Sequence, residues 1–265
     1  MALALRFAEE GEYSSRACVL SYEDEPVVTP AKAIFRWSKS VRDHLGGASS
    51  VAVKRLLVAT DGSPQRFLEA LTTNWQLVGT LIVTDQAILP TTLSTRPATA
   101  CQILSPHPVD HASFGADMAV IMPQEVSNGS IWRWTQALHA HLPAEEVIVF
   151  DSQLSTIYDF GGYANDGEPM IRMLSSASAR DAKFERLVPA LETPRYTTGI
   201  AAALLTQGEL RRRRVRAFIS LRSAHTTVDE SARSFGPLVS LLDLPVGSPA
   251  ALLPTLEDEF NVLYT

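Results

Sequence analysis

The stretch that decides the fold runs from Val51 to Thr84 and reads VAVKRLLVAT, DGSP, QRFLEALTTNW, QLVGTLIVT. Its first ten residues are mostly apolar and rich in β-branched types, which predicts a buried strand. Ser63 can cap a helix whose first residue is Pro64, and that helix is expected to reach about Asn74. The last nine residues predict a second buried strand. A strand, a helix and a strand in this order predict a βαβ unit with parallel strands and a right-handed crossover.

The same alternation continues outward from this unit. Further strands are expected at 16–21, 100–104, 116–122, 146–150, 170–174 and 215–221, and helices at 131–141, 196–210, 231–244 and from about 255. The segments 85–99 and 159–169 have loop compositions. Because strands alternate with helices, the predicted fold is an α/β three-layer sandwich around a mostly parallel central sheet. The chain is divided into a partly flexible segment 1–30, an α/β domain 31–247, and a short helix with an extended C-terminal tail, 248–265.

Composition excludes several classes of protein. Of the 265 residues 46% are hydrophobic and 20% charged, as in an ordinary globular protein with a proper core. The formal net charge of −6 provides no general attraction to nucleic acid or to an anionic membrane. Cys18 and Cys101 lack metal-site spacing, and both are expected to be reduced and at least half-buried. No signal peptide or membrane span is expected, so the chain is predicted to be cytoplasmic, with the nucleus as an alternative.

Motifs of the common α/β enzymes are missing from the sequence. It contains no phosphate-binding loop, no dinucleotide-binding glycine pattern and no nucleophile elbow. The best enzymatic signal is a set of three carboxylates, Asp61, Asp85 and Asp151, each just after an expected strand. Strand ends are where open α/β sheets place ligands, and three carboxylates could hold Mg²⁺ for phosphohydrolase chemistry. Aspartate is also simply favoured in turns, and no lysine or second motif completes a phosphatase set.

Histidines and arginines carry weaker signals. His107 and His111 are four residues apart, but the proline between them argues against a shared helical face. His139 and His141 are two apart in an expected helix and therefore point to different sides. No metal site and no cofactor are predicted. The run Arg211–Arg214, with Arg216 close behind, is interpreted first as a solvated connection at the negative end of a helix.

The C-terminal third resembles the proteasome assembly chaperone family. The resemblance is carried by the segment Thr193–Leu205 (TPRYTTGIAAALL), by the strand 215–221, by 228–242 with its Phe-Gly-Pro-Leu, and by the ending Leu263-Tyr264-Thr265. That ending resembles the hydrophobic-tyrosine-any (HbYX) motif with which proteasome activators and assembly chaperones enter pockets between the α subunits of the proteasome core. In such a tail, Leu263 and the Tyr264 ring fill an apolar pocket, and the terminal carboxylate meets a cation or backbone N–H groups.

The resemblance implies a non-enzymatic chaperone. Members of the family work as heterodimers on the outer face of the α ring, so the implied partners are the proteasome α subunits and a second family member, proteasome assembly chaperone 2. Docking would reside in Leu263, Tyr264 and Thr265, and neither nucleic acid nor a membrane is an expected partner. The alternative from a different class, a metal-dependent phosphohydrolase, would instead use the aspartates at the strand ends.

Overall fold

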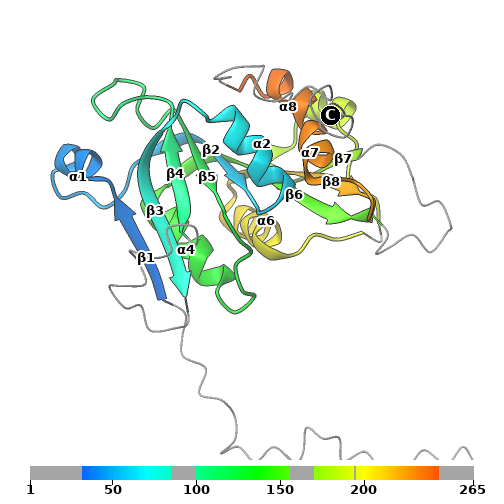
Figure 1. Cartoon of the computed structure of the whole chain (residues 1–265), viewed down its shortest axis with the longest axis horizontal. Helices are drawn as coiled ribbons and strands as arrows, with labels where there is room; N and C mark the ends of the chain where they lie inside the picture. Colours follow the sequence, from blue (N-terminus) through cyan, green and yellow to red (C-terminus); the bar gives the residue numbers. More distant parts are fainter. Residues whose placement is uncertain (1–31, 85–99, 156–169, 194, 245–265) are drawn as a thin grey trace, which may run out of the picture. The chain divides into compact units, whose positions relative to one another are not determined.

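The computed structural model describes residues 32–84, 100–155, 170–193 and 195–244, and all structural statements below concern these residues (Figure 1). The strands are β1 (Lys32–Trp37), β2 (Val53–Ala59), β3 (Gln76–Thr84), β4 (Cys101–Ser105), β5 (Asp117–Ile121), β6 (Ala144–Leu154), β7 (Met170–Ser175) and β8 (Arg214–Arg222). The helices are α1 (Lys39–Leu45), α2 (Ser63–Leu71), α4 (Ile131–His141), the 3₁₀ turn η5 (Ala177–Ala179), α5 (Ala182–Leu187), α6 (Gly199–Arg211), α7 (Val228–Arg233) and α8 (Gly236–Leu241).

The strands form one mixed sheet in the order β1-β3-β4-β5-β2-β6-β8-β7. Parallel ladders join β5, β2, β6 and β8, whereas the ladders on either side of this group are antiparallel. The strands β2 and β3 run in the same direction, as expected for the βαβ unit. They are not neighbours, however, because β4 and β5 lie between them. After α2 the chain therefore crosses to β3, next to the edge strand β1, and comes back through the antiparallel strand β4 to β5, which pairs with β2.

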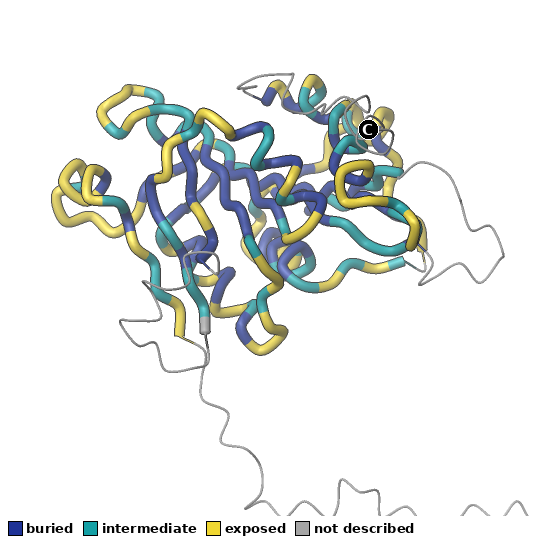
Figure 2. The backbone as a smooth tube through the Cα atoms, in the orientation of Figure 1, coloured by how far each residue is buried: buried dark blue, intermediate teal, exposed yellow. Residues whose placement is uncertain are grey.

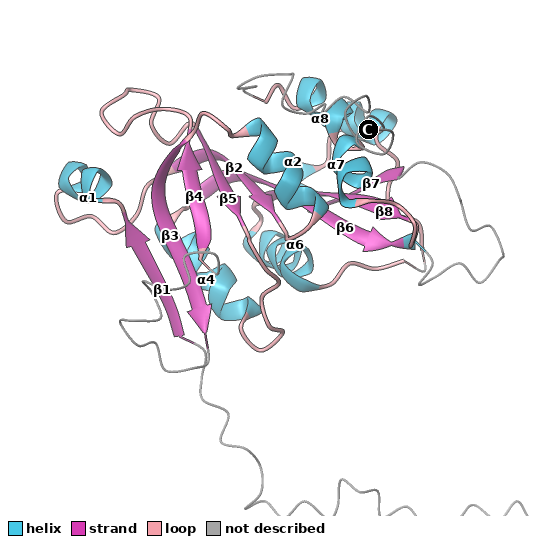
Figure 3. Cartoon of the chain, in the orientation of Figure 1, coloured by secondary structure: helices cyan, strands magenta, loops and turns pink. Residues whose placement is uncertain are grey.

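Helices cover both faces of this sheet, which confirms the three-layer α/β sandwich (Figure 3). Alternate residues of a central strand belong to two separate hydrophobic cores, because successive side chains of a strand point to opposite faces of the sheet. In β6, Val147 and Val149 join a core with helices α4 and α6. Their neighbours Ile148 and Phe150 join a second core with α2, α7 and α8. The central strands accordingly appear as the most continuously buried part of the described chain (Figure 2).

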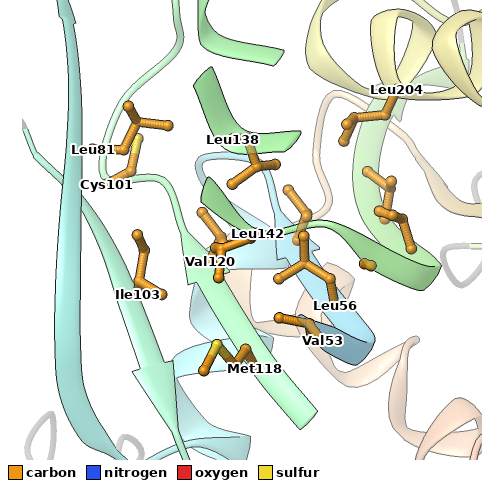
Figure 4. Close-up of a cluster of buried hydrophobic side chains, with 14 of the residues drawn as sticks. Val53, Leu56, Leu81, Cys101, Ile103, Met118, Val120, Leu138, Leu142 and Leu204 are labelled. Atoms are coloured by element: carbon orange, nitrogen blue, oxygen red, sulfur yellow. The ribbon is translucent and has the colours of Figure 1, made fainter. Parts of the chain in front are cut away.

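The first core is closed by side chains of α4 and α6 (Figure 4). Trp134 is completely buried there, and its indole N–H donates to the sulfur of Cys101 at 3.3 Å. Cys101 is a buried free thiol, as predicted, and burial raises its pKa to about 11. Trp132, two residues earlier in the same helix, is instead 44% exposed.

The small-residue helix α6 packs closely on β8, as its composition predicts. A Cβ atom added at Gly208 would lie 2.5 Å from Val215 Cγ2, far inside van der Waals contact. Glycine at this position therefore sets the distance between helix and sheet. The helix begins at Gly199, three residues later than expected, and it ends with Arg212 in a left-handed conformation.

Several elements differ from the sequence-based expectation. The single helix expected at 231–244 is two short helices, α7 and α8, because Pro237 starts a new helix and cannot continue an old one. The strand β1 and the helices α1 and α5 were not expected. The strand β1 is an edge strand with a half-exposed sequence, KAIFRW, and so lacks a strong apolar signal.

Other predictions fall outside the described residues: the strand at 16–21, the loops at 85–99 and 159–169, the helix near 255, and the tail 263–265. Among the helices of the described segments, none has both the length and the apolar character that crossing a bilayer requires.

The arginines 211–216 were expected to form a solvated connection, but one of them, Arg216, is buried. Arg216 is only 2% exposed, forms an ion pair with Glu146, and donates to the backbone oxygen of Ala179 at 2.9 Å. Its guanidinium also lies 4.4 Å from the ring centroid of Phe184. Arg216 thereby connects β6 and β8 to the segment that carries η5 and α5.

We predict that Glu146→Ala destabilises the fold by about 3–5 kcal/mol, because it leaves the Arg216 charge buried without a carboxylate. Arg216→Met removes the buried charge itself and keeps much of the volume, so it should be less damaging. Arg214→Met is a matched control, since Arg214 is an exposed partner of the same carboxylate at 3.6 Å and should change stability by less than about 1 kcal/mol. Urea denaturation of the three variants measures the order, and an Arg216→Met variant as unstable as Glu146→Ala would contradict it.

Candidate functional site

A pocket of about 270 Å³ lies at the carboxyl ends of the parallel strands. Thr60 and Asp61 line it just after β2, Asp151 lines it from β6, and Arg222 lines it from the end of β8. The carboxyl ends of parallel strands meet at one edge of a sheet, and open α/β sheets bind their ligands at this edge. Position alone therefore makes this pocket the first candidate for a site in the described chain.

Asp151 is the chemically unusual residue of the pocket. It is only 9% exposed, and Thr60 Oγ1 donates to its Oδ1 at 2.8 Å. Thr197 Oγ1 donates to its Oδ2 at 3.4 Å and accepts in turn from Gln153 Nε2 at 3.2 Å. Burial raises the pKa of Asp151 above its ordinary value, although the two hydroxyl groups oppose this, and the charge of Asp61 adds to the rise. A buried carboxylate with a raised pKa in a pocket is a common feature of functional sites.

Two helices begin at the pocket wall. The N-cap residue of α2 is Gly62 and that of α6 is Thr198, and neither makes a side-chain capping hydrogen bond. Gly62 and Gly199 have φ angles of 80° and 65°, which an L side chain rarely adopts. A Cβ atom at either glycine would meet nothing within 4 Å, so open space lies beside both helix starts.

The three aspartates predicted for a phosphohydrolase are not assembled as expected. Asp61 and Asp151 line the same pocket, but Asp85 lies outside the described residues. Its strand, β3, is separated from β2 by two other strands, so β3 lies about 14 Å from β2 across the sheet. Within the described segments, no three His, Cys, Asp or Glu side chains are grouped in a way that could hold a metal ion.

The histidines also do not form a site. His139 is 9% exposed and accepts from Arg213 Nη1 at 3.3 Å. Burial and the charges of Arg213 and Arg211 lower the pKa of His139 to about 4. His141 points elsewhere, as its spacing predicts, and stacks on Phe35. The rings of His107 and His111 do stack, with centroids 4.6 Å apart, in a loop rather than on a helix.

The predicted docking residues Leu263, Tyr264 and Thr265 lie outside the described residues. Conversely, the sequence analysis missed Thr60, Thr197 and Arg222 as pocket residues. Thr60 and Arg222 could have been found from their positions at the ends of expected strands. Thr197 could not, because its link to Asp151 depends on how the segment before α6 packs against β6.

The raised pKa of Asp151 leads to a prediction about stability. In the unfolded chain Asp151 ionises near pH 4, and in the folded chain it ionises at higher pH. The folded state therefore binds the proton more tightly, and stability is lost as the pH rises from about 4 through the raised pKa. Asp151→Asn removes this loss, so the variant should melt at a higher temperature than the natural chain at pH 7, with the difference vanishing near pH 4.

Thermal unfolding between pH 4 and pH 8 provides the measurement. Asp117→Asn is the control: Asp117 accepts two hydrogen bonds from Arg55, at 2.7 and 3.1 Å, and losing this carboxylate should lower the melting temperature at neutral pH. A lower melting temperature for Asp151→Asn at pH 7 would mean that the Asp151 charge stabilises the fold, contrary to the prediction.

No protein-family model matches this sequence, and no curated protein sequence matches it. The fold, by contrast, is similar to that of solved structures. Pyrococcus furiosus PbaA, described as an archaeal homolog of proteasome-assembly chaperone, has a TM-score of 0.54 at 11% identity, covering 88% of this chain and 93% of its own. PbaB of the same organism, described as an archaeal proteasome activator, has a TM-score of 0.56 at 10% identity, covering 89% and 98%.

A third similar structure is Mycobacterium tuberculosis Rv2125, described as a proteasome-assembly chaperone homologue. Its TM-score is 0.50 at 14% identity, covering 80% of this chain and 94% of its own. At such identities, a structural similarity establishes the fold. The chain therefore has the α/β fold of these proteasome-assembly chaperone homologues.

Proposed function

We propose that this chain is a proteasome assembly chaperone that binds the α ring of the core particle through Leu263, Tyr264 and Thr265. The observation that carries the proposal is the fold, which is similar over most of both chains to PbaA and to Rv2125. The ending Leu-Tyr-Thr adds an independent reason, because it has the hydrophobic-tyrosine-any pattern of proteins that dock on α rings. Fold alone does not specify function, so the two observations are needed together.

The proposal includes a heterodimer with proteasome assembly chaperone 2 and no enzymatic activity. A tail of three residues gives modest affinity, since ordering each residue costs about 1–2 kcal/mol. A second tail on the partner and contacts of the folded domains would add avidity. Such a complex can remain bound during assembly and then dissociate when the maturing ring changes the shape of the pockets. We place this activity in the cytoplasm, with the nucleus as an alternative.

A second candidate function, metal-dependent phosphohydrolysis, is favoured by one observation. Asp61 and Asp151 both line the pocket at the strand ends, and the pKa of Asp151 is raised. Against it stands the sequence, which has no phosphate-binding loop and no lysine placed beside these carboxylates by any motif. The two candidate functions use different residues, so one pair of variants separates them.

Deleting residues 263–265 should weaken binding to purified proteasome α rings and leave the melting temperature nearly unchanged, because a terminus contributes little to a core. The control is the double variant Asp61→Asn, Asp151→Asn, which should bind α rings as the natural chain does. Surface-immobilised α rings provide the binding measurement. Equal affinities for the truncated and intact chains would contradict the proposal, and Mg²⁺-dependent phosphatase activity lost in the double variant would favour the second candidate.

The terminal carboxylate, rather than the Thr265 side chain, should provide the ionic part of docking. Appending one glycine after Thr265 moves that carboxylate, which forms a charge-assisted bond of about 1.5–3 kcal/mol. Tyr264→Ala removes both the ring and the hydroxyl, whereas Tyr264→Phe loses about 1 kcal/mol with the hydroxyl alone. We therefore expect Tyr264→Ala and the added glycine to weaken α-ring binding far more than Tyr264→Phe, with Thr265→Ala nearly silent. A harmless glycine beside a damaging Thr265→Ala would exclude the carboxylate mechanism.

A further inference from the structure

The pocket at the strand ends has a charge distribution that selects among ligands. Among the described residues, three carboxylates line it, from Asp61, Glu125 and Asp151, but only one cationic side chain, that of Arg222. The surplus of negative charge disfavours a nucleotide, a sugar phosphate or inorganic phosphate, because like charges repel most strongly where water is partly excluded. A ligand with an ammonium group, and with no more than one negative charge, fits this wall.

Asp151 is where an ammonium group would bind. Its carboxylate is nine-tenths buried, yet its partners among the described residues are all neutral, namely the hydroxyls of Thr60 and Thr197 and the backbone N–H of Ser152, with no cationic side chain. Buried charges are ordinarily paired with an opposite charge, as Arg216 is with Glu146 in the same sheet. The unpaired carboxylate lines an open pocket, so a bound ligand can supply the missing cation.

The ligand should also carry one negative charge. Arg222 forms no ion pair with any described residue, and its position on the pocket wall leaves it available to a ligand. The first turns of α2 and α6 also line the pocket and contain no acidic residue, so their N–H groups favour an anion. Together with Arg222, these backbone N–H groups would bind a carboxylate of the ligand.

The remaining wall is apolar and limits the size of the ligand. Met122, Val126, Ile200 and Val228 line the same pocket. Its volume of about 270 Å³ is close to the lower end of the range of roughly 300–1,000 Å³ that small-molecule pockets span. These features suit a short aliphatic side chain beside a carbon that carries both charged groups.

We propose that this pocket binds a free α-amino acid with an aliphatic side chain, with the ammonium group on Asp151, the carboxylate on Arg222 and the start of α6, and the side chain against Ile200 and Val228. The proposal is independent of the α-ring function, since it uses none of residues 263–265. It gives the folded domain a small-molecule ligand in addition to the docking role of the tail.

The test is isothermal titration of the full chain with L-leucine and with two analogues that each lack one charged group. 4-Methylpentanoate has no ammonium group, and 3-methylbutylamine has no carboxylate. Leucine should bind saturably, and each analogue should bind at least about tenfold more weakly, a difference of about 1.4 kcal/mol. Inorganic phosphate should not bind. An analogue or phosphate that binds as tightly as leucine overturns the proposal, as does the absence of leucine binding at about 10 mM.

Two variants assign the binding to this pocket. Asp151→Asn should weaken leucine binding at least about tenfold, and Arg222→Gln should do the same because it removes the cation that meets the carboxylate of the ligand. Arg211→Gln is the matched control, because Arg211 is an exposed arginine at the far end of α6. Circular dichroism verifies that each variant is folded. Unchanged affinity in both pocket variants overturns the proposal.

Deletion of residues 263–265 separates this inference from the proposed function. The truncated chain should bind leucine as the intact chain does, even though it loses α-ring binding. If leucine binding disappears with the tail, the ligand site is not the pocket assigned here.

Discussion

The burial of both faces of β2, β6 and β8 is the constraint on which the rest of the structure depends. Because these strands are apolar on both sides, they can be stable only if helices cover each face. The two cores follow directly, with α4 and α6 on one side and α2, α7 and α8 on the other. The helices start beside the strand ends, so the same constraint places the starts of α2 and α6 around the pocket.

The buried charged side chains near the two ends of the central strands differ in whether they have a partner of opposite charge. Near the amino ends of β6 and β8, Arg216 is paired with Glu146 and bonded to a backbone oxygen, which makes this charge part of the fold. Near the carboxyl end of β6, Asp151 has neutral hydrogen-bond partners, no cationic partner among the described residues, and a raised pKa. A paired buried charge maintains structure, whereas one without a counter-charge at a pocket wall weakens the fold unless something binds it. This contrast distinguishes the structural end of the sheet from its candidate site.

The proposed docking tail and the pocket are two separate places where function can reside. The similar structures themselves are described in different roles on one fold, PbaA as a homolog of proteasome-assembly chaperone and PbaB as a proteasome activator. The fold therefore acts as a common scaffold, and function has to be argued from particular residues. The tail is the reason for proposing α-ring binding, and the charges around Asp151 are the reason for proposing a ligand.

The sequence already predicts the alternation of strands and helices, and with it the three-layer α/β class, because apolar runs and helix caps act over a few residues. It predicted α4 with its observed bounds, 131–141, and found Asp61 and Asp151 as strand-end carboxylates. Only the tertiary structure decided that β4 and β5 separate β2 from β3, since strand pairing joins segments far apart in the chain. It also decided that Arg216 is buried on Glu146 and that Thr197 holds Asp151, because these contacts span 70 and 46 residues and no local pattern encodes them.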